Sequence, residues 1–292
     1  MPEGKPPILT SPAALGDLWT SLSDIFEVRG VPDPRESAKA LICAAANCAP
    51  LSFITDPGRL VSSSMIAKLN EFAQRRLDRE PVSRILGKRE FWGLDLELNK
   101  FALDPRPDTE RLVEACLAWV RGAGLTRPRI LDIGVGAGPV LCALLSELTE
   151  ATGVGIDLSA DACRLAQRNI ARLGLSRRSE VHCIGMTDFR SGGFDLVVSN
   201  PPYIRTEVIE SLDEEVRNFD PLIALDGGED GLYSYRSIIS SYKQWVKDGG
   251  LCAVEIGYDQ AGSLLALLVE AGLQGEVLKD AGGNDRVVTW GG

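Results

Sequence analysis

The chain has 292 residues, of which 45% are hydrophobic and 25% charged, and its formal net charge is −10. This length allows one large and one small domain, and the composition is that of a globular protein, which argues against a disordered or fibrous chain. The acidic balance also argues against a surface that neutralises many phosphates, as nucleic-acid binding requires.

Two residue types narrow the chemistry further. His182 is the single histidine, which argues against a His-centred catalytic triad or a multi-histidine metal site, so no metal is expected. The seven cysteines form no C-x-x-C pair and lie mostly in apolar segments, where free cysteine packs as a small hydrophobic residue. The start of the chain lacks a signal-peptide layout, and no apolar run reaches spanning length, so a cytoplasmic protein without a membrane segment is expected.

Residues 1–85 are predicted to form a small helical domain. Apolar residues recur there every three or four positions, for example in "LGDLWTSLSDIFEVRG", and the breaks "VPDP" and "TDPG" separate four or five short helices. Residues 86–106 contain "EFWGLDLELNKFALDP", whose alternation is typical of a β-hairpin, and this segment is expected to link two domains.

Residues 107–292 are predicted to form an α/β domain. Strand-like segments such as "RILDIG", "GVGID" and "FDLVVS" alternate with segments of helical periodicity. Such alternation predicts a doubly wound, mostly parallel sheet with helices on its faces.

A glycine-rich loop follows the first of these strands. In "LDIGVGAGPV", Gly134, Gly136 and Gly138 stand between a strand and a helix, where glycine lets the backbone turn tightly and approach a ligand. Pro139 then falls at the first helical position, which tolerates the missing N–H. Such a loop is typical of nucleotide-binding folds, although it also occurs where only packing requires it.

Acidic residues near this loop favour one type of cofactor. Asp157 ends the second strand, where a carboxylate can accept hydrogen bonds from both ribose hydroxyls, as with NAD or S-adenosylmethionine. Asp132 would repel a pyrophosphate but suits an ammonium and a sulfonium, which favours S-adenosylmethionine. After the third strand, Asp188 is expected to accept from the adenine amino group and Phe189 to pack on the ring.

The segment "NPPY" follows the strand "FDLVVS". Asn200 ends this strand at the carboxyl edge of the sheet, where open α/β folds bind ligands, and Pro201 and Pro202 stiffen the chain after it. The prolines leave the Asn200 side-chain oxygen and the Pro201 carbonyl as acceptors that suit an –NH2 group, and Tyr203 can stack on the planar group that carries it. No general base is evident in the sequence.

Taken together, the motifs resemble those of the peptide chain release factor glutamine N5-methyltransferases. The segments "EPVSRILGKREFWG", "PRPDTE", "LDIGVGAG", "SNPPYI", "FDPLIALDGGEDGL" and "GNDR" occur in the order typical of that family, from about Glu80 to Arg286. "NPPY" alone is shared with adenine-N6 and cytosine-N4 DNA methyltransferases, whereas "REFWG" with "PRPDTE" is much narrower.

The resemblance implies a class I S-adenosylmethionine-dependent methyltransferase fold, Rossmann-like with a doubly wound seven-stranded sheet, and a small helical N-terminal domain joined by the β-hairpin. It implies methyl transfer to the side-chain amide nitrogen of the glutamine in the Gly-Gly-Gln motif of release factors, in translation termination. The N-terminal domain would dock the release factor, and the enzyme is expected to be a monomer.

The site residues that the motifs and the resemblance suggest fall into two groups. The substrate amide is expected to contact Asn200, Pro201, Pro202 and Tyr203. The cofactor is expected to contact Asp132, Gly134, Val135, Gly136, Ala137, Gly138, Asp157, Asp188, Phe189 and Asn200. "PRPDTE" would line the same crevice, and Phe91 is expected to face the cofactor. Relatives commonly have hydroxyl residues at Val135 and Ala137 and an indole at Phe189.

Three alternatives remain open at this point. A glutamine methyltransferase acting on a ribosomal protein would keep every motif. An adenine-N6 DNA methyltransferase is disfavoured by the acidic balance and by the lack of a target-recognition domain. A non-catalytic module that binds the cofactor would use "NPPY" only as a turn.

Overall fold

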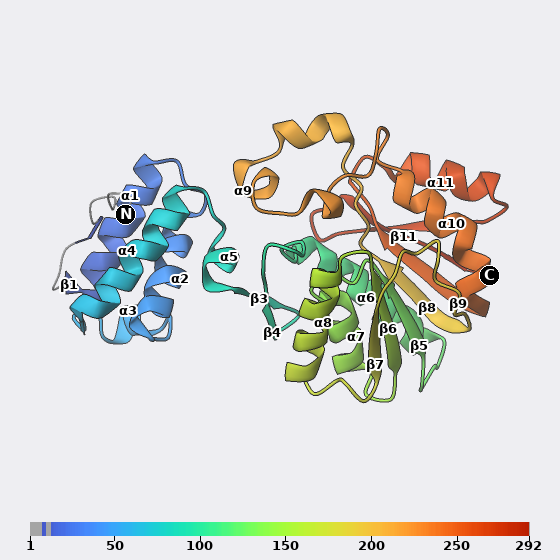
Figure 1. The fold of residues 1–292 in the computed structure, drawn as a ribbon, viewed down its shortest axis with the longest axis horizontal. Helices are drawn as coiled ribbons and strands as arrows, with labels where there is room; N and C mark the ends of the chain where they lie inside the picture. The colour runs from blue at the N-terminus through green and yellow to red at the C-terminus, as the bar shows by residue number, and fades with distance from the viewer. Residues whose placement is uncertain (1–7, 10–12, 292) are drawn as a thin grey trace. The chain divides into compact units, whose positions relative to one another are not determined.

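A computed structural model describes residues 8–9 and 13–291. The chain divides into two compact units, Met1–Gly87 and Lys88–Gly292, called here the N-terminal and C-terminal units. None of the described helices is both long and apolar enough to cross a membrane. The fold is drawn in Figure 1.

The N-terminal unit is helical in its described residues, as the periodicity predicts. Its elements are β1 (Ala13–Ala14), α1 (Leu15–Val28), α2 (Pro34–Ala46), α3 (Ser52–Thr55), β2 (Leu60–Val61), α4 (Ser63–Leu77) and α5 (Val82–Leu86). Ser62 caps α4 by accepting a hydrogen bond from the Met65 N–H, and Pro34 opens α2. The apolar faces of these helices form one core that includes Leu22, Phe26 and Leu41.

The C-terminal unit begins with the predicted hairpin. Its strands β3 (Lys88–Phe91) and β4 (Leu94–Glu97) pair antiparallel, with Trp92 and Gly93 at the turn. Both turn residues have positive φ, of 53° and 69°, as a tight hairpin turn requires. Phe91 is buried in the core, so the structure does not support the expectation that it faces a cofactor.

After the hairpin, strands and helices alternate. The strands are β5 (Arg129–Ile133), β6 (Thr152–Asp157), β7 (Ser179–Cys183), β8 (Phe194–Ser199), β9 (Val246–Glu255), β10 (Gly275–Lys279) and β11 (Asp285–Gly291). The helices are η1 (Pro107–Thr109), α6 (Glu110–Gly122), α7 (Pro139–Glu147), α8 (Ala160–Arg172), η2 (Thr206–Ser211), α9 (Glu214–Arg217), η3 (Leu222–Ala224), α10 (Tyr233–Trp245) and α11 (Ala261–Glu270).

The strands form one seven-stranded sheet in the order β10-β11-β9-β8-β5-β6-β7. The strands from β9 to β7 in this order are parallel, whereas β11 runs antiparallel to β9 and β10 antiparallel to β11. The order reverses at β5, which pairs with β6 on one side and β8 on the other. The prediction of a doubly wound, mostly parallel sheet is therefore confirmed, and the crevice expected at such a reversal lies at the carboxyl ends of these three strands.

Side chains that alternate along the strands build two core layers. Ile130 of β5 joins α6, α7 and α8 in one cluster, whereas its neighbour Leu131 joins α10 and α11 in the other. Figure 1 shows these two groups of helices on opposite faces of the sheet. A strand buried on both faces needs apolar residues at nearly every position, which explains the continuous run in "FDLVVS".

Candidate active site

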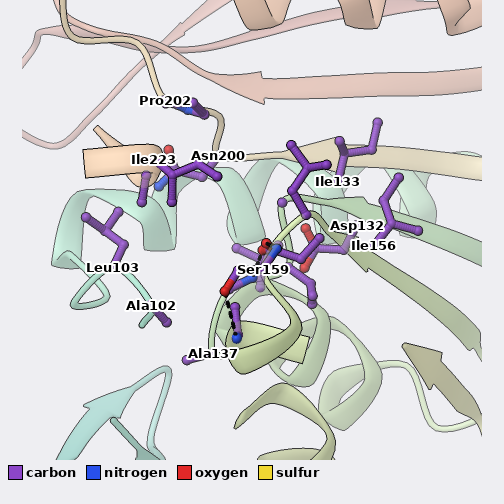
Figure 2. A pocket seen from close by; sticks show the side chains of 18 of the residues that line it. Ala102, Leu103, Asp132, Ile133, Ala137, Ile156, Ser159, Asn200, Pro202 and Ile223 are labelled. Atoms are coloured by element: carbon purple, nitrogen blue, oxygen red, sulfur yellow. Dashed lines mark hydrogen bonds between the residues drawn. The ribbon is translucent and has the colours of Figure 1, made fainter. Parts of the chain in front are cut away.

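A pocket lies at the carboxyl edge of the sheet, where the order of the strands reverses. It encloses a volume of about 270 Å³. Residues from several segments line it: Phe101, Ala102, Leu103, Pro105, Thr109, Asp132, Ile133, Gly134, Val135, Gly136, Ala137, Pro139, Val140, Ile156, Asp157, Leu158, Ser159, Ala162, Ile184, Met186, Asn200, Pro202, Ile223, Ala224, Asp226, Tyr233 and Ser234. In the view of Figure 2, Asn200, Pro202 and Ile223 lie at one end, and Ile133, Asp132 and Ile156 at the other.

The glycine loop forms one wall of the pocket. Gly134, Gly136 and Gly138 have φ values of 75°, 55° and 85°, which explains why glycine occupies all three positions. Gly138 precedes α7 and does not line the pocket itself, whereas the other four residues from Gly134 to Ala137 do. Val135 and Ala137 line the pocket but are each only 2% exposed as whole residues.

Two carboxylates extend from β5 and β6 toward this loop. Asp157 accepts hydrogen bonds from the Gly136 N–H at 3.0 Å and the Ser159 N–H at 2.8 Å, one on each oxygen. A carboxylate offers about four acceptor positions, so two remain for a ligand that carries neighbouring hydroxyls. The hydrogen bond from Gly136 also joins Asp157, at the end of β6, to the glycine loop after β5, so that the two form one site.

Asp132 is the more buried of the two acids. It is 2% exposed, lines the pocket, and accepts a hydrogen bond from the Leu141 N–H in the first turn of α7 at 3.1 Å. Burial raises the pKa of Asp132 to about 7, the bond from Leu141 lowers it, and the charge of Asp157 raises it. A cation at this end of the pocket would favour the ionised form.

The structure does not support the predicted adenine contacts of Asp188 and Phe189. Asp188 is exposed and Phe189 is 7% exposed, and neither lines the pocket. The Phe189 ring instead packs in the core, 6.2 Å from the ring of Phe194, and its carbonyl accepts from the Trp245 indole at 3.3 Å.

Ile184 and Met186 occupy the pocket wall after β7 instead. They come one and three residues after Cys183, the last residue of that strand. This is the signal that sequence reasoning missed, because residues directly after a parallel strand lie at its carboxyl edge. Leu158, which directly follows β6, lines the pocket too and is 66% exposed.

The "NPPY" segment forms the other end of the pocket. Asn200 and Pro202 line it, whereas Pro201 is buried and Tyr203 packs against the core that α10 and α11 cover. The Asn200 Nδ2 atom donates to the Thr109 hydroxyl at 3.1 Å. Thr109 belongs to "PRPDTE", so this motif lines the crevice as expected.

Tyr203 is held from two sides. Its hydroxyl donates to Glu255 Oε1 at 3.4 Å, and its carbonyl accepts from Gln260 Nε2 at 2.9 Å. Burial raises the pKa of Tyr203, and the negative charge of Glu255 raises it further, so the phenol stays neutral. Glu255 and Gln260 were not among the residues that the sequence singled out.

The segment "FDPLIALDGGEDGL" comes close to the "NPPY" loop. Ile204 N donates to Leu225 O at 3.0 Å, and Gly227 N donates to Ile204 O at 2.8 Å. A Cβ at Gly231 would lie only 2.5 Å from Tyr203 O, so the two backbones approach too closely for a side chain. This packing places Ile223 and Asp226 on the pocket wall.

Arg106 and Asp220 tie "PRPDTE" to the same segment. Arg106 Nη2 lies 2.6 Å from Asp220 Oδ2, and the other oxygen of Asp220 accepts from the Asp104 N–H at 3.2 Å. The Asp220 side chain is 1% exposed. Two of the motifs therefore meet through a buried carboxylate beside the pocket.

Comparisons with known proteins agree with this architecture. Residues 17–87 match the model of the PrmC N-terminal domain, and residues 130–219 match that of a methyltransferase domain. A release factor glutamine methyltransferase from Agrobacterium fabrum is 44% identical, over 91% of this chain and 93% of the relative. One from Caulobacter vibrioides is 43% identical, over 92% and 93%.

Among solved structures, the hMettl16 catalytic domain in complex with MAT2A 3′UTR hairpin 6 superimposes with a TM-score of 0.56. The two chains are 18% identical, and the match covers 80% of this chain and 84% of the other. At this identity the likeness shows the fold alone.

Proposed function

The chain belongs to the release factor glutamine methyltransferase family, and on that premise we propose how its pocket performs the reaction. One end of the pocket binds S-adenosylmethionine, and the other binds the glutamine side chain of the Gly-Gly-Gln motif of a release factor. The observation that carries this proposal is the joint presence in one pocket of the two acids, Asp132 and Asp157, and of the Asn200 carboxamide. When bound, S-adenosylmethionine supplies an electrophilic methyl group on a sulfonium.

The residues present fit this cofactor. Asp157 has two acceptor positions left for the ribose hydroxyls after it accepts from Gly136 and Ser159. Asp132 offers a buried negative charge that complements the ammonium and sulfonium. Leu158, Ile184 and Met186 supply an apolar wall for the adenine ring, in place of Asp188 and Phe189.

Asn200 and the Pro201 carbonyl orient the substrate. Because the Asn200 NH2 group donates a hydrogen bond to Thr109, the Asn200 side-chain oxygen remains to accept from the glutamine amide. Two acceptors that bind the two N–H bonds turn the nitrogen lone pair toward the methyl group. Such positioning of two bound reactants can contribute on the order of 7–11 kcal/mol. In this geometry Tyr203, whose phenol is held by Glu255, supports the wall behind Pro202.

The remaining assignments follow from the same premise. The N-terminal unit, which matches the PrmC N-terminal domain, would provide the docking surface for the release factor. The domain division proposed is 1–85 for docking, 86–106 for the hairpin linker and 107–292 for catalysis. The enzyme is proposed to work in the cytoplasm, as a monomer.

The test measures transfer of a labelled methyl group from S-adenosylmethionine to an unmodified release factor. Asn200→Ala should lower kcat by about 100-fold or more, because the variant loses an acceptor that orients the amide. Its affinity for S-adenosylmethionine should change little, because the acids are intact. Gln167→Ala, which removes an exposed carboxamide of α8 outside the pocket, is the matched control.

Two substrates complete the design. A release factor with the tripeptide glutamine replaced by alanine should accept no label, and unmethylated DNA should accept none either. Normal turnover by Asn200→Ala would refute the assigned role of this residue, and label on DNA would refute the assigned substrate.

A further inference from the structure

A buried glutamate stands directly behind the substrate end of the pocket. Glu255 is the last residue of β9, is 1% exposed, and does not line the pocket. Its Oε1 atom accepts from the Tyr203 hydroxyl at 3.4 Å. Its Oε2 atom is buried and makes no hydrogen bond of ordinary length within the described part of the chain. Such a carboxylate oxygen is costly to bury unless a donor turns toward it.

The Thr109 hydroxyl is a donor that can turn toward it. Among the groups that lower the pKa of Glu255, hydrogen bonding by Thr109 has the largest effect, ahead of the charge of Arg286 and the Tyr203 hydroxyl. A hydroxyl has one hydrogen, which rotates freely, and two lone pairs. Thr109 can therefore donate to Glu255 and still accept from Asn200.

The direction of this chain of hydrogen bonds follows from the chemistry of its last member. An ionised carboxylate only accepts, so a Thr109 hydroxyl that turns toward Glu255 donates its single hydrogen there. The Thr109 oxygen can then only accept from Asn200, which must present its NH2 group, as the 3.1 Å contact shows. The Asn200 oxygen is thereby turned to the opposite side. Without the carboxylate, Thr109 could equally donate to Asn200, and the carboxamide could turn over.

We propose that Glu255 is a positioning residue, which acts through Thr109 to fix the direction of the Asn200 carboxamide and through the phenol to hold Tyr203. This inference rests on the proposed role of Asn200 as acceptor for the substrate amide. It gives a role to a carboxylate at a position of the sheet where burial makes a charge unfavourable.

The same arrangement makes the orientation depend on pH. Burial raises the pKa of Glu255 to about 7, and the charge of Asp108 raises it further, against Thr109, Arg286 and Tyr203, which lower it. The Tyr235 hydroxyl lies 2.9 Å from the Glu255 backbone carbonyl oxygen and 3.3 Å from Gln260 Oε1, so it is bonded to the backbone of Glu255 and to Gln260. A protonated Glu255 can donate to Thr109. The Thr109 hydroxyl is then free to donate to Asn200, so the Asn200 carboxamide is no longer held in one orientation. At saturating cofactor, kcat should therefore fall as the pH drops through about 7.

The experiment compares kcat, KM and pH profile in Glu255→Gln. A glutamine has the same shape but can donate to Thr109, so kcat should fall by about 10- to 100-fold. KM for the release factor and Kd for S-adenosylmethionine should change little, and the acid limb of the kcat profile should disappear. Asp195→Asn is the matched control, because Asp195 is a buried carboxylate near the start of β8, at the other edge of the sheet.

Variants of Thr109 test the relay itself. Thr109→Val should lower kcat to a similar extent, and Thr109→Ser, which keeps the hydroxyl, should restore it. The double variant Glu255→Gln/Thr109→Val should be no slower than the slower single variant, because both changes break the same chain. Thr109→Val also tests the relay should Glu255→Gln fail to fold.

The results separate this inference from the proposed function. A slow Asn200→Ala with a normal Glu255→Gln would overturn the relay alone, whereas a normal Asn200→Ala would overturn the role of Asn200 on which it rests. Additive losses in the double variant, or an acid limb that persists in Glu255→Gln, would also overturn the relay. A loss in Thr109→Ser as large as in Thr109→Val would do so too.

Discussion

Asp132 offers the sharpest test of the cofactor end of the pocket. Burial raises its pKa to about 7, so about 90% of the side chains are ionised at pH 8 and about 10% at pH 6. If the cation of S-adenosylmethionine requires the ionised form, Kd should increase about tenfold between these pH values. The affinity decreases toward acid pH because a bound cation lowers the pKa of a nearby carboxyl, so protonation of Asp132 opposes binding as the pH falls through about 7.

Asp132→Asn should remove this dependence. The amide is uncharged at every pH and keeps an oxygen for the Leu141 N–H, so the melting temperature should not fall. At pH 8 the variant should bind S-adenosylmethionine about tenfold or more weakly than the wild type, roughly as the wild type does at pH 6. Glu255 titrates in the same range but lies outside the pocket, so its titration should affect kcat more than this affinity.

Calorimetric titration from pH 6 to 8 measures these affinities directly. S-adenosylhomocysteine, which lacks the sulfonium charge, should show a weaker pH dependence in the same assay. A Kd of the wild type that stays constant over this range would refute the role assigned to Asp132. A pH dependence that survives in Asp132→Asn would refute it as well.

Two further predictions concern the segment that packs on the "NPPY" loop. Gly231→Ala places a Cβ 2.5 Å from Tyr203 O and 2.7 Å from Gln260 Nε2, at a φ of 74°. The strain should lower kcat by about tenfold or more and leave Kd for S-adenosylmethionine unchanged. Steady-state kinetics and calorimetry measure the two quantities, and an equal loss in both would contradict the prediction. Asp220→Asn weakens the pairing with Arg106, so the free energy of unfolding should fall by about 1–3 kcal/mol. Urea unfolding measures this change, and an unchanged midpoint would contradict the prediction.

The sequence by itself determined the class of fold and the chemistry of the site. Alternating apolar segments can be buried only in a parallel sheet covered on both faces, and a glycine loop after the first strand requires positive φ that other residues adopt at a cost. Asp132, Asp157 and Asn200 could be predicted because each stands at the end of a parallel strand. The carboxyl ends of such strands meet at one edge, whatever the details of packing.

Only the tertiary structure decided which side chains of the loops face the pocket. Asp188 and Phe189 were predicted as adenine contacts but do not line the pocket. A loop after a strand has no period from which the orientation of its residues follows. The turn after β7 directs Met186 inward and Phe189 into the core.

Glu255 shows the same division between sequence and structure. It ends an apolar strand and has no motif of its own. Tyr203, which donates to it, is 52 positions away in the sequence, and Thr109, through which it is inferred to act, is 146 positions away (255 − 109). Hydrogen bonds between such distant side chains depend on how strands and loops pack, which local patterns in a sequence do not encode. The sequence therefore determined where the chemistry occurs, and the packing of the loops determined which residues orient it.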